Sequence, residues 1–237
     1  PKATLGYSDG TYYYIPDNWS DEIFENNVRQ EYNLSVSGAS DKMNYYMSAG
    51  YLDDQGIVPN SGFQRYSARL KADYQVKPWL KLGANVSFTH YDSREQDTEG
   101  GTSNANIFYA SNIMGAIYPM YIRDAQGNIM TDNRGFQRYD YGKKGQDTNG
   151  SRNTIPNANP LASYMLDKMK YSGDVVSGKW FADVDIWGGI KAKVNIGVDA
   201  NNVRNTDMVN PFYGQYSETT GVGGLISVST QRTFSVN

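Results

Sequence analysis

The feature that most constrains the fold is a strict alternation of apolar and polar side chains. Between Gln64 and Val76, one phase reads Tyr66, Ala68, Leu70, Ala72, Tyr74 and Val76. The other phase reads Arg65, Ser67, Arg69, Lys71, Asp73 and Gln75. Successive side chains of a β-strand point to opposite faces of the sheet. The segment is therefore predicted to be a strand with one apolar face and one hydrated face.

The same alternation recurs along the chain and predicts about seven strands. They are expected around Leu34–Val36, Tyr45–Tyr51, Gln64–Val76, Leu80–Thr89, Lys179–Ile186, Ile190–Ala200 and Leu225–Val236. Two residues break the pattern, since Phe181 falls in a polar phase and Arg232 in an apolar phase. The fold class predicted from this periodicity is all-β and antiparallel.

The predicted strands are longer than those of most globular proteins. Several keep their pattern for about 10 residues, against roughly 5–6 in an average strand and roughly 9–11 in a tilted membrane-spanning strand. Aromatic residues stand near both ends of the apolar phases, as Tyr66 with Tyr74 and Tyr45 with Tyr51. Aromatic girdles at the two lipid–water boundaries have this arrangement. Strand length and aromatic position both favour a transmembrane barrel.

Composition does not distinguish a soluble β-protein from a membrane barrel. The mean hydropathy of the 237 residues is -0.64, and the apolar run that comes nearest to a membrane-spanning length, Ile113–Ile122, is broken by Pro119. That run is far short of the roughly 20 residues of a membrane-spanning helix. There are no cysteines, which excludes disulfides and thiolate metal sites, and the net charge of -3 argues against a nucleic-acid partner.

The connections between predicted strands alternate between short and long. Short turns are expected at Gly38–Lys42, Val76–Pro78 and Trp187–Gly189. Longer links are expected at Asp53–Gly62, Asp92–Ser172 and Asn205–Gly224. Outer-membrane barrels have short periplasmic turns on one rim and long extracellular loops on the other, whereas a soluble sandwich has no reason to sort its loops. The pattern favours the barrel.

The longest link, Asp92–Ser172, is the predicted functional segment. Loops on a rigid scaffold often carry binding residues, and this one contains a hairpin-like turn at Asp124–Asn128. Its aromatic residues are the candidate substrate-binding residues: Tyr109, Tyr118, Tyr121, Phe136, Tyr139 and Tyr141. They could stack on sugar rings or peptide side chains at a pore mouth. They could also pack the loop's own core, which is favoured for most of them.

No catalytic residue, metal site or cofactor is predicted, so the chain is not expected to be an enzyme. The single histidine, His90, lacks ligand partners at a suitable spacing and is expected at the membrane interface. An acidic run in the long link comprises Asp92, Glu95, Asp97 and Glu99. A run in a loop does not establish the carboxylate separation that glycosidases need, and Asp124–Asp132 lacks the EF-hand register.

Several short motifs resemble SusC-like, TonB-dependent transporters of the outer membrane. They are Asn18–Phe24, Tyr32–Gly38, Asn44–Tyr46, Gly50–Leu52, Gln55–Ile57, Phe63–Ser67, Trp79–Gly83, Asn159–Leu161 and Pro211–Gly214. Each motif is weak alone, but their order and spacing together are quite specific. The resemblance covers nearly the whole chain.

The resemblance implies an active importer of oligosaccharides or peptides in Bacteroidetes-type bacteria. In that family a 22-stranded barrel is closed by an N-terminal plug, a SusD-like lipoprotein caps it outside, and TonB supplies energy. Residues 1–237 would form part of the barrel domain, with 92–172 as an extracellular loop insertion. The plug, the TonB box and the remaining strands are expected to lie outside this sequence, which starts at Pro1 without a signal peptide.

Two other functions remain open from the sequence. A passive porin or structural outer-membrane protein would share the barrel wall but lack a plug. A secreted glycan-binding β-sandwich would share the alternation but dissolve without detergent. The expected partners of the importer are the lipoprotein cap, the TonB complex, the cargo and outer-membrane lipid, with no nucleic acid.

Overall fold

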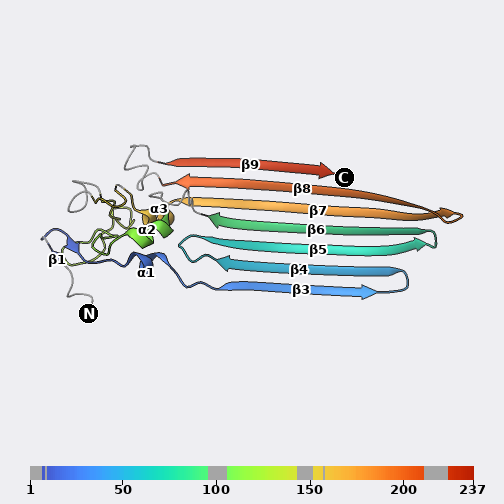
Figure 1. The fold of residues 1–237 in the computed structure, drawn as a ribbon, viewed down its shortest axis with the longest axis horizontal. Helices are drawn as coiled ribbons and strands as arrows, with labels where there is room; N and C mark the ends of the chain where they lie inside the picture. Colours follow the sequence, from blue (N-terminus) through green and yellow to red (C-terminus); the bar gives the residue numbers. More distant parts are fainter. Residues whose placement is uncertain (1–6, 9, 96–105, 143–151, 157, 211–223) are drawn as a thin grey trace.

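A single antiparallel sheet makes up most of the computed structural model, which describes residues 7–8, 10–95, 106–142, 152–156, 158–210 and 224–237. Figure 1 shows its seven strands side by side, each paired with the next in the sequence. They are β3 (Arg29–Ala39), β4 (Met43–Gln55), β5 (Gly62–Lys77), β6 (Leu80–Glu95), β7 (Lys168–Trp187), β8 (Ile190–Val209) and β9 (Leu225–Val236). The prediction of seven antiparallel strands is confirmed.

The strand register brings the apolar phases of all seven strands onto one face of the sheet. Residues paired across neighbouring strands share a face. One transverse row reads Val36, Met47, Leu70, Val86, Gly178, Val198 and Val236. The next row reads Leu34, Ala49, Ala68, Phe88, Val176, Ala200 and Phe234. The result is a continuous apolar face rather than seven separate stripes.

A row of polar and aromatic residues bounds this apolar face at one end. It reads Tyr32, Tyr51, Tyr66, His90, Asp174, Asn202 and Arg232. The rings of Tyr51 and Tyr66 lie 5.0 Å apart, and Arg232 donates a hydrogen bond to Asn202 at 3.2 Å. Arg232 therefore breaks the apolar phase because it has reached the boundary of the apolar band.

The height of the apolar band can be estimated from β5. Its apolar phase runs from Tyr66 to Val76. At roughly 3.3 Å per residue and a tilt of roughly 40°, this stretch spans roughly 25 Å along a barrel axis. The apolar belt of outer-membrane barrels has about the same height. The dimensions of the sheet thus fit a membrane-spanning wall.

The three long links are shorter than the sequence predicted. β6 continues to Glu95 and β7 begins at Lys168, so the longest link covers 96–167 instead of 92–172. The other two cover 56–61 and 210–224. Beyond the boundary row polar residues such as Asp53, Gln64 and Asp92 occupy the apolar phase, so the alternation that marks a strand disappears there. The ladder of backbone hydrogen bonds nevertheless continues, which is why the strands extend further than expected.

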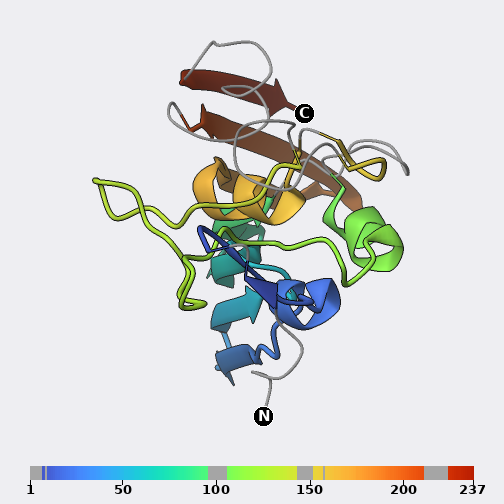
Figure 2. The same ribbon diagram turned by 90° about the vertical axis from the view of Figure 1, so that its left-hand side faces the viewer.

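Three short helices, which the sequence analysis missed, lie at the end of the sheet that carries the long links (Figures 1 and 2). They are α1 (Trp19–Ile23), α2 (Ile107–Ile113) and α3 (Pro160–Leu166). Each begins after an asparagine, at position 18, 106 or 159, whose side chain accepts a backbone N–H of the first turn. None of the helices in the described ranges has the length and apolar character to cross a membrane.

These helices and their connections pack around a core of their own. We call residues 10–24, 106–142 and 152–166 the crown; it also contains β2 (Tyr13–Tyr14), which pairs with β1 (Tyr7–Ser8). Its buried core includes Trp19, Ile23, Ile107, Met120, Leu161 and Tyr164. Val58, from the link between β4 and β5, also joins this core. The short turns lie at the opposite end of the sheet (Figure 1).

Candidate functional site

The face of the sheet opposite the apolar face is small, polar and charged. Its central row reads Ser35, Ser48, Arg69, Ser87, Ser177, Asp199 and Ser235. Short hydroxyl side chains leave the backbone close to solvent and present many hydrogen-bonding groups. This polar face suits the wall of a water-filled channel, whose interior is polar in transmembrane barrels.

Lysines and aspartates pair across strands where the polar face approaches the short turns. Lys81 lies 3.8 Å from Asp73, and Lys193 lies 3.5 Å from Asp183. Lys191, near the next turn, lies 3.2 Å from Asp185. Cross-strand pairs of opposite charge contribute roughly 0.2–1 kcal/mol each. They also balance charge, so this end of the face carries its lysines without a local excess.

Phe181 lies on the polar face because it covers a glycine. It is the register partner of Gly83, where a Cβ atom would collide with the Phe181 ring. The ammonium groups of Lys81 and Lys193 lie 5.8 Å and 5.1 Å from the ring centroid. An aromatic ring placed over a strand glycine supplies packing that the glycine lacks, and the two lysines add cation–π contacts. Phe181 thus departs from the alternation because its ring packs over Gly83.

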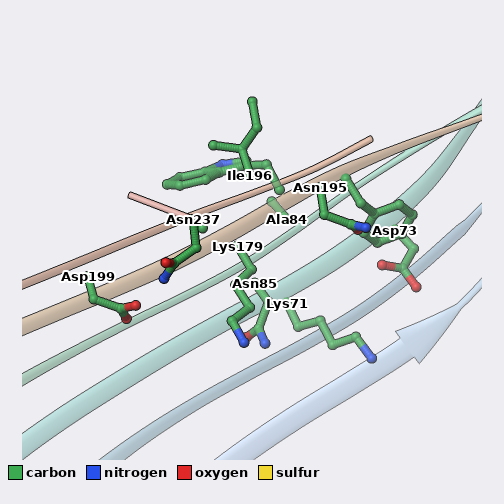
Figure 3. Close-up of a pocket in the computed structure, with 12 residues that line it drawn as sticks. Lys71, Asp73, Ala84, Asn85, Lys179, Asn195, Ile196, Asp199 and Asn237 are labelled. Atoms are coloured by element: carbon green, nitrogen blue, oxygen red, sulfur yellow. The ribbon is translucent and has the colours of Figure 1, made fainter. Parts of the chain in front are cut away.

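The middle of the polar face contains a hollow lined by charged side chains of both signs. Figure 3 shows Lys71, Asn85 and Lys179 on one side of the strands and Ile196 on the other. Lys71, Asn85 and Lys179 are direct partners across β5, β6 and β7. Arg69, one polar-face position further along β5, donates a hydrogen bond from Nε to Asn85 Oδ1 at 3.0 Å. Arg69 thus contacts the Asn85 amide, and Lys71 and Lys179 occupy the paired positions on the two neighbouring strands.

The crown contains a buried, bidentate ion pair between distant segments. Arg123 donates from Nη1 and Nη2 to the two carboxylate oxygens of Asp17, at 3.1 Å and 3.0 Å. The two side chains are only 8% and 5% exposed. Asp17 also accepts the backbone N–H of Met120 at 2.6 Å. This pair joins the segment before α1 to the middle of the long link.

A second buried network surrounds Asn159, whose position the sequence analysis noted only as part of a family motif. Its side-chain amide donates to the carbonyls of Met120 at 3.0 Å and Asp140 at 2.9 Å, while its oxygen caps α3. Arg152 lies beside it, 3.4 Å from the Asp140 carboxylate, and donates to the carbonyls of Ile155 and Ala158. Burial lowers the pKa of Arg152, against the field of Asp140. The network gives the crown one fixed arrangement.

The crown brings five of the six candidate aromatic residues together. Tyr139 and Tyr141 are buried in its core, and Tyr109, Tyr118 and Tyr121 pack against that core while keeping partial exposure. The rings of Tyr121 and Tyr139 lie 5.3 Å apart, and burial raises the pKa of both. Phe136 is half-buried near the tip of a turn that its backbone N–H closes onto Asp132. Packing within the crown accounts for most of the six.

His90 and the nearby acids form ion pairs and hydrogen bonds. His90 Nδ1 lies 2.7 Å from Asp174 in the boundary row, and Asp92 pairs with Lys170 at 3.1 Å. Glu95 accepts a hydrogen bond from Ser93, while Asp97 and Glu99 lie outside the described residues. Within the described ranges no group of three or more His, Asp or Glu side chains is placed to hold a metal ion.

The crown is tethered to the sheet by hydrogen bonds at its base. Asn60, between β4 and β5, donates to the carbonyl of Tyr164 in α3 at 2.8 Å. Asp167, between α3 and β7, accepts the backbone N–H of Asn210 at 2.7 Å. Burial, with a smaller contribution from Asp207, raises the pKa of Asp167 to about 6. At the base of the crown, burial therefore disfavours the ionised form of Asp167.

Asp167→Asn is expected to stabilise the crown at neutral pH. The folded pKa lies above the ordinary value of 3.8, so folding favours the protonated acid and stability falls as pH rises from about 4 to about 6. The asparagine cannot ionise, yet its Oδ1 can still accept the Asn210 N–H. Hydrogen exchange of α3 should slow in the variant at pH 7 and match the unsubstituted protein near pH 4. An equal change at both pH values would contradict this assignment.

Known proteins resemble the chain in sequence and in fold, although no protein-family profile matches it. TonB-dependent receptor P3 of Formosa agariphila is 24% identical over 215 residues, which cover 87% of this chain and 19% of that protein. TonB-dependent receptor SusC of Bacteroides thetaiotaomicron is 33% identical over 89 residues, covering 37% of this chain and 9% of SusC. The chain thus spans under a fifth of the length of either relative.

The structure of the RagAB peptide importer in its open-open state contains the same arrangement of strands. The TM-score is 0.69 at 22% identity, over 96% of this chain and 23% of that chain. A second RagAB structure gives a TM-score of 0.64 at 23% identity. The fold is therefore that of a segment of a larger antiparallel β-barrel wall. The resemblance to SusC-like, TonB-dependent receptors, expected from the motifs, is confirmed by these relatives.

Proposed function

We propose that this chain forms part of the wall and of the outer mouth of a TonB-dependent importer in the bacterial outer membrane. The single observation that carries the proposal is the two-faced sheet. Its apolar face is continuous across seven strands and ends in a row of polar and aromatic residues, while its opposite face is mostly polar. The apolar face would contact lipid and the polar face would line the channel.

The crown would lie outside the cell in this arrangement. It stands at the end of the sheet with long links, while the other end has turns of two or three residues, at 40–42, 78–79 and 188–189. Long loops of outer-membrane barrels are extracellular. A SusD-like lipoprotein cap would contact the crown from outside, and TonB would act through a plug encoded elsewhere in the protein. Residues 1–237 would then belong to one barrel domain, with 92–172 as its long extracellular loop insertion.

Oligosaccharides or peptides are the proposed cargo. Support comes from the resemblance to SusC and from the RagAB structures, which are those of a peptide importer. Of the candidate aromatics, Tyr109, Tyr118 and Tyr121 keep exposed edges that could stack on cargo. Tyr139 and Tyr141 would support them from the crown's core.

Active import is tested in cells whose chromosomal copy of the gene is deleted. Cells that express the full-length protein from a plasmid are compared with cells that do not. Uptake from defined mixtures of oligosaccharides and of peptides is followed by mass spectrometry of the medium. Depletion of at least one cargo class should depend on the gene and should fall to the background of cells without it when a protonophore is added. Loss of uptake with the protonophore is expected because TonB-coupled import requires the proton-motive force.

Gene-dependent uptake that continues undiminished with the protonophore would instead identify a passive porin.

Orientation is checked in the same cells with single cysteines, which is simple because these 237 residues contain none. A cysteine at exposed Gln126 in the crown should react with an impermeant maleimide on intact cells. One at Asp41 should react only after permeabilisation, and the reverse pattern would invert the proposed topology.

A further inference from the structure

The lysines of the polar face, together with Arg69, fall into two groups. Lys81, Lys191 and Lys193, near the short turns, each lie within 3.8 Å of an aspartate carboxylate. In contrast, Arg69, Lys71 and Lys179 in the middle of the face form no ion pair within the described part of the chain. The positive charge of the second group is therefore not neutralised by an ion pair within the described residues, unlike that of the first group.

The three unpaired cations occupy neighbouring positions on the polar face. Lys71 and Lys179 flank Asn85 in register, so their Cα atoms are about 10 Å apart across two inter-strand spacings. Arg69 uses one N–H to reach Asn85 Oδ1 and keeps its two terminal nitrogens for other acceptors. The Asn85 amide accepts that bond through its oxygen, and its Nδ2 remains a fourth donor with no hydrogen bond in the described part of the chain.

Like charges gathered in this way repel each other unless an anion joins them. Two carboxylates share the hollow: Asp73 pairs with Lys81 at 3.8 Å, and Asp199 forms no ion pair with Arg69, Lys71 or Lys179. Figure 3 shows the side chains of Asn85 and Lys179 side by side on the polar side of the strands, with the Lys71 side chain extending from the neighbouring strand on the same side. Charged hydrogen bonds from several converging donors are strong and favour an anionic acceptor.

We propose that Arg69, Lys71, Lys179 and the Asn85 amide form a carboxylate-binding station on the channel wall. The proposal rests on the proposed barrel, since the polar face must line the channel. A carboxylate is the expected occupant because aspartate carboxylates neutralise the other three lysines of this face. Its source is either an acidic group of the cargo, as in an acidic peptide or a uronic-acid glycan, or a side chain from another part of the same transporter.

Zero-length cross-linking of the full-length protein in native membranes tests the station directly. A carbodiimide activates a carboxylate, and a lysine Nζ in contact then attacks its carbon; an amide bond forms and the carboxylate oxygen leaves within the urea by-product. The assay is run without probe, with a labelled pentapeptide containing two glutamates, and with labelled trigalacturonate. Lys81 with Asp73 and Lys193 with Asp183 are built-in positive controls.

Lys71 or Lys179 should be joined to a carboxylate in at least one arm. A product with a probe identifies the cargo as the source, and a product without a probe identifies a carboxylate of the transporter. If the control pairs cross-link while Lys71 and Lys179 remain free amines in every arm, the station does not exist. This readout does not require transport, so failure of the importer proposal and failure of the station are distinguishable.

Uptake supplies a second test where import is observed. The double variant Lys71→Gln and Lys179→Gln is compared with Lys191→Gln, which removes a lysine that has a partner. If cargo supplies the carboxylate, the double variant should lose about tenfold in uptake of the glutamate pentapeptide relative to its glutamine analogue. The Lys191→Gln variant should keep the ratio of the unsubstituted protein. An unchanged ratio in the double variant, together with a probe cross-link at neither lysine, would overturn a cargo source.

Discussion

Arg123→Met is expected to unfold the crown while leaving the barrel intact. The substitution leaves the buried carboxylate of Asp17 without its bidentate partner, although the Met120 N–H remains. Breaking a buried pair from one side typically costs about 3–5 kcal/mol. The crown has its own core, so this loss should be local. Limited proteolysis of membranes should cleave the crown rapidly, while the barrel keeps its heat-modifiable mobility on gels.

The double variant Asp17→Leu and Arg123→Met is the matched control. It removes both charges, and replacing a buried ion pair by apolar residues is often close to neutral. Most of the protease resistance should therefore return. A crown that resists protease as well in Arg123→Met as in the unsubstituted protein would show that the pair contributes little to its stability.

Leu70→Arg is expected to impair barrel assembly. Leu70 lies in the row with Val86 and Met47, near the middle of the apolar band. An arginine facing lipid near mid-membrane costs about 2–4 kcal/mol, and much less on the channel side. The folded fraction, measured as heat-modifiable protein after refolding into vesicles, should fall in this variant.

Ser177→Arg places the same side chain on the opposite face at nearly the same depth. Ser177 is paired with Ser87 and Asp199, so the new cation would have water and a carboxylate nearby. This variant should assemble normally. Equal losses from Leu70→Arg and Ser177→Arg would mean that the apolar face is not in lipid.

The strands were predictable because burial in lipid on one side and water on the other imposes a period of two. Residues Gln64 to Val76 show it without interruption, and β5 extends only slightly beyond them. The strand ends were not predicted where the contrast between an apolar and a polar phase is lost. Near Asp92 and Lys170 polar residues occupy the apolar phase, so the strands continue without a sequence signal. Arg232 is a related case, since only the register reveals that it lies in the boundary row.

The crown was much harder to predict, because its structure depends on contacts between distant segments. The contact between Asp17 and Arg123 joins positions 106 residues apart, and neither residue stands in a local pattern. A local signal did exist for the helices, since Asn18, Asn106 and Asn159 act as N-caps and Pro160 opens α3. The unpaired state of Lys71 and Lys179 required the pairing of β5, β6 and β7 and could not be inferred from spacing along one strand.

The central claim is that the two faces of the sheet contact lipid and channel water respectively, and a cysteine scan of β5 tests it most directly. Single cysteines from Ala68 to Tyr74, in a full-length protein otherwise free of cysteine, are labelled with a small fluorophore in vesicles. Brominated lipid should quench positions 68, 70, 72 and 74, and aqueous iodide should quench positions 69, 71 and 73. Quenching without alternation, or with the opposite phase, would contradict the membrane-spanning wall.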